Sequence, residues 1–530
     1  MRNPMVIRLI LTVALIGSLT ACTDETTDPA KANPTDNGKL PPGSDGKSKK
    51  VTITYLDGTY ASPVPPPDGP GVKMINEKFN VDYKAEFIPF AEYAQKLPVR
   101  MASGDFPDVI GMESADSRFF KWAKKGAFLP LDSYIDNYPT LRMVPDYVWD
   151  AMKVDGKIYG IPRYFPVQYG KTPLIRKDWL DNLGLKVPTN FEELKKVAIA
   201  FTKNDPDGNG KDDTYGIMLA MGIQYDYDFG VNWNPAAWYH KNKEGQIIPG
   251  VIAEESKERI QMLADLYKEG AIPKDWAVTK IGDVKKAFYA GKFGIFYEQA
   301  YDKWPTDFRT LKSVNPNAEL VPIPPFKAPD GSQGFNGLSG YFQIFALSSK
   351  MKDDPDKVSR FLEMNDYFRT FIPLEQRTPA NANYDWLNGK NGVGYKIVNG
   401  SQENSDFSQG LQPRFYLESR FWAPNDDANE VSKVAVDPLQ KSLFSSMETM
   451  FKSYKAYINP INRIKSEIYM EKWAELEQYV RDEQAKMIIG QASVNEWDGM
   501  VQRFLDKGGK EVLDDVNKLF KEKGIKGEWK

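Results

Sequence analysis

The stretch DPDGNGKDDTYG places an oxygen ligand at every second position. Asp205, Asp207, Asn209 and Asp213 offer side-chain oxygens, and Lys211 offers its backbone carbonyl. These residues match positions 1, 3, 5, 7 and 9 of a calcium-binding loop, and a glycine supplies the sharp turn at position 6. The pattern therefore predicts a calcium site.

The loop lacks the ligand that usually closes such a site. Its twelfth position, commonly a bidentate Glu, is Gly216. We therefore expect a structural calcium site of low affinity, with a dissociation constant of about 0.1–1 mM as in extracellular modules. The chain has only one such loop, which argues against a paired calcium sensor. The alternative is a polar turn without metal.

The counts of cysteine and histidine exclude several kinds of site. Cys22 is the single cysteine and His240 the single histidine. No intramolecular disulfide or zinc thiolate cluster can form. Sites with several histidines are excluded, and a Ser-His-Asp triad would have to use His240. We expect His240 to be a surface residue, and we find no recognisable nucleophile motif.

The amino terminus has the features of a lipoprotein signal peptide. Arg2 and Arg8 precede the apolar run LILTVALIG, which fits a signal-peptide core better than a membrane span. The following residues, LTAC, resemble a bacterial lipobox, which implies cleavage before Cys22 and lipidation of its thiol. Two acyl chains suffice for a stable anchor. We expect residues 1–21 to be removed and the protein to be anchored at the outer face of the cell membrane. The alternative is an ordinary secretory signal.

The segment after the signal peptide is predicted to be a disordered tether over residues 22–50. Its residues 23–50 include no aromatic residue and one leucine, too little apolar surface to offset the entropy of ordering. Loss of residues 1–21 removes two arginines and no acidic residue, which changes the net charge from −3 to −5. With both signs interspersed, nothing indicates a nucleic-acid partner.

The folded part of the chain begins at Val51 with alternating strand and helix patterns. VTITYLDG from Val51 predicts a strand, GVKMINEKFN a helix and VDYKAEFIPF a second strand. This alternation predicts an open α/β sheet, and the length of the chain predicts two lobes. Farther along, Thr189 and Glu192 have the spacing of a capping box, which predicts the start of a helix.

Several stretches in a fixed order resemble a known family. They are the lipobox, ASGDFPDVIG, GKIYGIP, LIRKDWLDNLGLKVPTNFEEL, DPDGNGKDDTYG, GKFGIFYEQAYDKW and MIIGQASVNEWDGMVQRFLDKGG. Together they span nearly the whole mature chain. The chain is similar to the extracellular solute-binding lipoproteins of family 1, in the long form found in Gram-positive bacteria. These proteins are receptor components of carbohydrate importers of the ABC type. One departure is Pro98, within an expected helix.

The resemblance implies a two-lobed α/β fold of the type II periplasmic-binding-protein kind, with a hinge and an interlobe cleft for the ligand. By analogy, residues 51–166 and 341–373 form the first lobe, and residues 167–340 and 374–530 form the second. It also implies a monomer without enzymatic activity that passes an oligosaccharide to ABC permease subunits. Related alginate- and oligosaccharide-binding proteins hold calcium in similar loops.

Candidate ligand-binding residues follow from two arguments. Aromatic side chains can cover the apolar faces of sugar rings while polar groups bind the hydroxyl rim. In open α/β sheets, ligands also lie beyond the carboxyl ends of strands. For each tryptophan alone, packing in a core is the alternative. The candidates are Asp57, Tyr60, Glu113, Ser114, Arg163, Tyr164, Trp233, Trp238, Glu298, Trp304 and Trp422.

The most specific expectation concerns GKFGIFYEQAYDKW. We expect a buried strand over residues 294–297, with Glu298 at its end and Trp304 on the next helical turn, where it would stack on a sugar ring. Two other functions remain open from the residues alone. One is a lipid-anchored polysaccharide hydrolase or lyase, for which two carboxylates suffice. The other is a receptor for peptides or cell-wall fragments.

Overall fold

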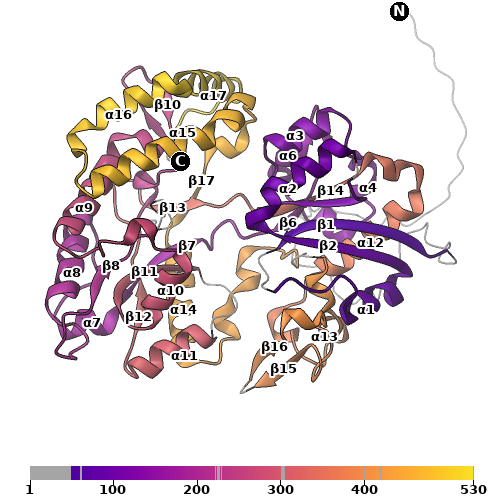
Figure 1. Cartoon of the computed structure of the whole chain (residues 1–530), viewed down its shortest axis with the longest axis horizontal. Helices are drawn as coiled ribbons and strands as arrows, with labels where there is room; N and C mark the ends of the chain where they lie inside the picture. Colours follow the sequence, from indigo (N-terminus) through magenta and orange to yellow (C-terminus); the bar gives the residue numbers. More distant parts are fainter. Residues whose placement is uncertain are drawn as a thin grey trace, which may run out of the picture. The chain divides into compact units, whose positions relative to one another are not determined.

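The computed structural model describes residues 49–59, 63–104, 106–220, 223, 227, 229–299, 305–398, 400–417 and 421–528. Figure 1 labels the helices and strands of these residues. The signal peptide, Cys22 and nearly all of the tether lie outside the described residues, as do Tyr60 and Trp304. Within the described ranges, no helix is both long enough and apolar enough to cross a membrane.

The first sheet has five strands in the order β2-β1-β3-β14-β6. The first three are parallel, whereas β14 runs antiparallel to β3 on one side and to β6 on the other. The predicted alternation of strands and helices from Val51 is confirmed. The strands are β1 (Val51–Thr59), β2 (Val81–Pro89), β3 (Val109–Met112), β6 (Ile161–Tyr164) and β14 (Tyr341–Leu347).

The first lobe also contains helices and a short hairpin, β4–β5. Pro98 lies inside α2, which nevertheless continues through it. The Asp116 carboxylate caps α3 by accepting from the backbone N–H groups of Arg118 and Phe119. The elements are α1 (Pro70–Phe79), α2 (Phe90–Ser103), α3 (Ser117–Lys124), α4 (Asp132–Ile135), α5 (Pro139–Arg142), α6 (Asp146–Met152), β4 (Lys153–Val154), β5 (Lys157–Ile158) and α12 (Pro355–Arg369).

The second sheet has four strands in the order β12-β7-β11-β8. The strand β11 lies between antiparallel β7 and parallel β8. The strands are β7 (Lys171–Arg176), β8 (Tyr215–Ile217), β11 (Phe293–Gln299) and β12 (Leu320–Pro322). The helices of this half are α7 (Lys177–Asn182), α8 (Phe191–Lys203), α9 (Glu254–Lys268), α10 (Ile281–Tyr289), α11 (Pro305–Val314) and α14 (Pro438–Ser453).

The start of α8 differs by one residue from the capping box expected at Thr189. The cap is Asn190, whose side chain accepts from the N–H of Glu193 at 2.9 Å. The Glu193 carboxylate in turn accepts from the backbone N–H and the hydroxyl of Thr189. These backbone and hydroxyl hydrogen bonds hold the pKa of Glu193 below its ordinary value. The capping oxygens are thus those of Asn190 and Glu193.

The C-terminal helices α15 (Glu467–Ile488), α16 (Trp497–Phe504) and α17 (Lys510–Glu522) pack together, shown in yellow tones in Figure 1. They contribute Leu476, Trp497 and Phe520 to the core of the second lobe. Short elements fill the rest: β9 (His240–Lys241), β10 (Ile247–Ile248), β13 (Gly334–Gly337), α13 (Ala382–Leu387), β15 (Tyr395–Val398), β16 (Ser401–Asn404) and β17 (Lys455–Ile458).

The buried apolar side chains form two large clusters, one around each sheet. The first cluster includes residues from Tyr384 to Ala423, a stretch expected from the family resemblance to belong to the second lobe. The second cluster resumes at Val431. We therefore propose that the chain makes its third crossing between Ala423 and Val431, about fifty residues later than residues 373–374. The two cores account for the two-lobed α/β architecture.

Candidate functional site

Segments that connect the two cores are hydrogen-bonded to one another. The segment after β6 lies beside the segment before β14: the N–H of Leu338 donates to the carbonyl of Val167 at 3.0 Å, and the N–H of Phe165 donates to that of Gly340 at 3.3 Å. Gly340 has a φ of 81° and lies against Tyr147. These segments connect the two cores, and we therefore propose them as the hinge.

Asp426, in the proposed third crossing, is hydrogen-bonded to the first crossing, the segment after β6. One carboxylate oxygen accepts from the backbone N–H groups of Val167 and Gln168, each at 2.9 Å, and the other accepts from the Tyr164 hydroxyl at 2.6 Å. Burial, together with the nearby Asp426 charge, raises the pKa of Tyr164 far above its ordinary value. Because its hydroxyl is bound to Asp426, Tyr164 serves the hinge in this structure. Sequence reasoning missed Asp426.

The carboxyl end of the first sheet carries several of the predicted ligand residues. Glu113 and Ser114 are exposed just beyond β3. Arg163 lies on β6, 6% exposed, with its guanidinium 5.4 Å from the centre of the Phe342 ring. Between them lies Gln343, whose N–H donates to the Glu113 carbonyl at 3.0 Å. Glu113, Ser114 and Arg163 therefore gather at one edge.

Gln343 is an unusual residue at this edge that the sequence did not reveal. The ladder between β14 and β6 is irregular there: Phe342 and Gln343 together face Arg163. Its φ is 68°, a left-handed conformation that normally selects glycine at such bulges. Its side chain is fully buried, and neither amide atom has a hydrogen-bond partner among the described residues. Such strain concentrates at functional sites.

Asp57, another predicted ligand residue, is fully buried at the end of β1. Its carboxylate accepts from the Tyr55 hydroxyl at 2.6 Å and from the N–H of Gly58 at 2.7 Å. It covers Gly111 so closely that a Cβ there would lie 2.0 Å from a carboxylate oxygen. Burial raises the pKa of Tyr83, and the Asp57 charge adds to the effect. Asp57 thus organises the sheet edge from within.

Glu298 lies within β11, which confirms the buried strand expected over residues 294–297. Its side chain is 7% exposed. The carboxylate accepts from the Tyr289 hydroxyl at 3.1 Å and lies 3.2 Å from the Lys285 ammonium. Across the ladder it faces Thr172. The second lobe therefore presents a charged and hydroxyl-bearing cluster at the end of its strands.

The predicted tryptophans with described positions all lie in cores. Trp238 is fully buried, with its ring 5.6–6.2 Å from those of Tyr469, Trp473 and Phe520. Its burial leaves it no route to a ligand. His240, expected at the surface, is also buried, 3.1 Å from the Glu255 carboxylate. A hydrogen bond from His240 holds the pKa of Glu255 below its ordinary value.

Trp233 and Trp422 are also buried. Trp233 is 6% exposed and donates from its indole nitrogen to Glu258 at 2.7 Å. Trp422 is 3% exposed and lies against the Tyr164 ring, with the Arg369 guanidinium 4.8 Å from its own ring. Both side chains therefore belong to the cores, which is the alternative considered for each tryptophan.

The predicted calcium loop draws its oxygen-bearing side chains together. The amide of Asn209 donates to carboxylate oxygens of Asp207 at 2.8 Å and of Asp213 at 3.2 Å. The Asp205 carboxylate accepts from the N–H groups of Asn209 at 3.1 Å and Gly210 at 2.9 Å. These backbone bonds, that of Gly210 first, lower the pKa of Asp205, whereas burial and the neighbouring Asp205 raise that of Asp207.

The far end of the loop is occupied by packing against α8. The hydroxyl of Thr214 donates to the Phe201 carbonyl at 2.8 Å, so it is not directed to a metal. A Cβ at Gly216 would lie 2.2 Å from the Ala198 carbonyl, which excludes a glutamate at the twelfth position. Within the described part of the chain, no three acidic, His or Cys side chains are arranged as a metal site. The loop does gather carboxylate and amide oxygens, the type of ligand that calcium prefers.

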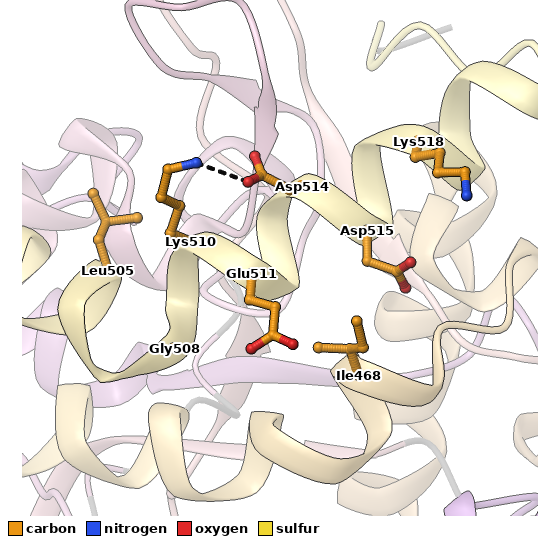
Figure 2. A pocket seen from close by; sticks show the side chains of 8 residues that line it. All are labelled: Ile468, Leu505, Gly508, Lys510, Glu511, Asp514, Asp515 and Lys518. Carbon is orange, nitrogen blue, oxygen red and sulfur yellow. Dashed lines mark hydrogen bonds and ion pairs between the residues drawn. The ribbon is translucent and has the colours of Figure 1, made fainter.

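The structure also has an open pocket of about 530 Å³ (Figure 2). It is bordered by α15 and α17, and its acidic groups already have partners. Asp514 accepts from Lys510 at 2.8 Å and from Gln246 at 2.9 Å, and Asp515 accepts from the Ser466 hydroxyl at 2.5 Å. None of the predicted ligand residues lines it.

Comparisons with known proteins agree over nearly the whole chain. The pattern of the bacterial extracellular solute-binding protein family matches residues 66–363. Lipoprotein LipO of Bacillus subtilis (strain 168) is 27% identical over 483 residues, covering 89% of this chain and 92% of the relative. The polygalacturonan/rhamnogalacturonan-binding protein YtcQ of the same strain is 26% identical over 523 residues, covering 98% of each.

A solved structure shows the same fold. The crystal structure of the alginate-binding protein AlgQ2 without calcium ion superposes with a TM-score of 0.64 at 21% identity, covering 89% of this chain and 98% of that protein. At this identity the likeness establishes the two-lobed architecture.

Proposed function

We propose that this chain, which belongs to the bacterial extracellular solute-binding protein family, captures an oligosaccharide outside the cell and delivers it to an ABC import permease. The observation that carries the proposal is the match over 98% of both chains to a polygalacturonan/rhamnogalacturonan-binding protein. The relatives are binding proteins, which favours capture without chemical conversion. We propose that the chain acts as a monomer.

The proposed hinge supports this function because it allows ligand binding to change the arrangement of the two lobes. A solute that contacts both lobes stabilises the arrangement in which both sets of contacts form. It shifts the population of arrangements only by its difference in affinity for them. The permease then reads the arrangement of the lobes. The three hydrogen-bonded crossings around Asp426 are where this motion is controlled.

We assign the solute to the strand ends of the two lobes. The first lobe contributes Glu113, Ser114 and Arg163, and the second contributes Glu298 with Lys285 and Tyr289. Carboxylates, hydroxyls and cationic groups suit the hydroxyl rim of a saccharide. Tyr60 and Trp304 stay predictions for aromatic contacts with the sugar rings. Trp233, Trp238 and Trp422 are assigned to the cores.

A binding screen tests the function. Oligosaccharides, acidic and neutral, should raise the melting temperature of the purified protein, because a ligand that binds the native state stabilises it by mass action. Calorimetry with the strongest hit should show weaker binding in Glu298→Gln and Trp304→Ala, whereas Glu77→Gln, an exposed change on α1, should bind as the parent does. Stabilisation by peptides alone, or release of shortened saccharides on incubation, would contradict the proposal.

We propose that the protein is held at the outer face of the cell membrane through lipid on Cys22. The lipobox pattern and the similarity to lipoprotein LipO support this location. Cells fed a labelled fatty acid should incorporate it into the parent protein and not into Cys22→Ser. Equal labelling of the two proteins would exclude the anchor.

We also propose that the loop at Asp205, Asp207, Asn209, the Lys211 carbonyl and Asp213 holds a structural calcium ion. Calcium would join the end of α8 to the start of β8 through oxygen ligands. Chelation should lower the melting temperature and added calcium restore it, and Asp205→Ala with Asp207→Ala should abolish the response. A melting temperature that ignores the chelator would favour a polar turn without metal.

A further inference from the structure

Lys292 lies beside the predicted calcium loop, outside its sequence. Its ammonium is 2.6 Å from a carboxylate oxygen of Asp213, and the hydrogen bond lowers the pKa of that carboxyl. The other oxygen of Asp213 accepts from the Asn209 amide. Both oxygens of the ninth-position ligand are therefore engaged inside the protein.

The fold holds Lys292 at this place through its backbone. Its carbonyl accepts from the N–H of Tyr215 at 2.9 Å, and the next residue, Phe293, pairs with Tyr215 in the ladder of β11 and β8. The start of β11 is thereby tied to the strand that ends the loop. The position of the ammonium beside Asp213 follows from the sheet, although the Lys292 side chain itself is 45% exposed.

The loop offers few side chains that could bind a metal ion. Its tenth residue, Thr214, is buried with its hydroxyl bound to the Phe201 carbonyl, and its twelfth position is closed by the Ala198 carbonyl. The carboxylates left for a metal are those of Asp205, Asp207 and Asp213. A lysine that holds one of the three removes a ligand and adds a positive charge next to the site.

We propose that Lys292 is a built-in competitor of calcium, whose ammonium pairs with Asp213 in the metal-free loop and must be displaced when the ion binds. This inference rests on the calcium site proposed above. Without metal, Lys292 offsets part of the repulsion among the three carboxylates and keeps the loop folded. With metal, Lys292 is released to solvent. Calcium affinity is thus set by an ion pair as well as by the missing twelfth ligand.

Lys292→Met tests the proposal in the purified mature protein after chelation. Calcium titration by calorimetry should show a dissociation constant about three- to tenfold lower than the parent's, because a competing ion pair and a repelling charge are removed. The melting temperature in chelator should fall, and the rise on adding calcium should be larger. Lys292→Arg, which keeps the charge, should retain the weaker affinity.

Lys203→Met is the matched control. Lys203 forms an ion pair of similar exposure with Glu269 at 2.5 Å at the end of α8, outside the loop. Its loss should leave calcium affinity unchanged. If the parent binds calcium and Lys292→Met binds it equally or more weakly, the competition by Lys292 is overturned while the calcium site stands. If neither protein binds calcium up to about 10 mM, well above the range of extracellular modules, the site and the inference both fail. Binding by Lys292→Met alone would support the competition.

Discussion

Asp426→Ala removes the side chain that joins the third crossing to the first. Three hydrogen bonds to one carboxylate are lost, at 2.6, 2.9 and 2.9 Å. A hydrogen bond to a charged group in a buried setting contributes about 1.5–3 kcal/mol. Asp426 is half-buried, so water can replace its hydrogen bonds to the two N–H groups in part. Tyr164 is only 8% exposed, so water reaches its hydroxyl less easily. We expect the free energy of unfolding to fall by about 2–4 kcal/mol.

Urea denaturation followed by tryptophan fluorescence measures this loss. An unchanged slope m would show that the same surface is exposed on unfolding, so that the midpoint reports stability. Asp427→Ala is the control. Its carboxylate accepts a hydrogen bond from the Tyr169 hydroxyl at 2.5 Å, so this substitution removes one hydrogen bond where Asp426→Ala removes three. It should lose about 1 kcal/mol.

A double-mutant cycle isolates the bond between Tyr164 and Asp426. Tyr164→Phe alone removes one of the three bonds, and in the Asp426→Ala background it should have less effect. We expect a coupling energy of about 1 kcal/mol, because the residues are in direct contact. A loss below about 0.5 kcal/mol for Asp426→Ala, or effects that simply add, would refute the assignment of Asp426 as the joint of the hinge.

Two further outcomes are expected. Trp238→Ala should lower the free energy of unfolding in urea by about 3–5 kcal/mol, as for a core aromatic, and leave saccharide affinity in calorimetry unchanged. Gln343→Gly should be more stable in urea than Gln343→Ala, because only glycine relieves the φ of 68°; equal stability would exclude backbone strain.

The strands and cores follow from local patterns in the sequence. The small and apolar run from Gly294 to Tyr297 is a buried strand as expected, because its residues suit burial on both faces. The observed start of α8 lies one residue after the predicted one. Two adjacent capping pairs are compatible with the sequence, Thr189 with Glu192 and Asn190 with Glu193, and the structure uses the second. The choice depends on packing of Phe191 into the core.

The candidate site was less predictable because its partners are distant in sequence. Trp238 stands among polar residues, yet its ring partners Tyr469, Trp473 and Phe520 lie more than two hundred residues later. Nothing in the local sequence predicts the left-handed backbone of Gln343, because residues other than glycine seldom adopt that conformation. Likewise, no composition change marks the crossing near Asp426.

The position of β14 inside the first sheet has a consequence for biosynthesis. This strand separates β3 from β6 in the first sheet, and Leu347 pairs with Val109. Residues 51–164 therefore cannot complete their sheet until the ribosome has made nearly two hundred further residues. Such distant pairing slows folding. Until then, the first lobe lacks the strand that lies between β3 and β6.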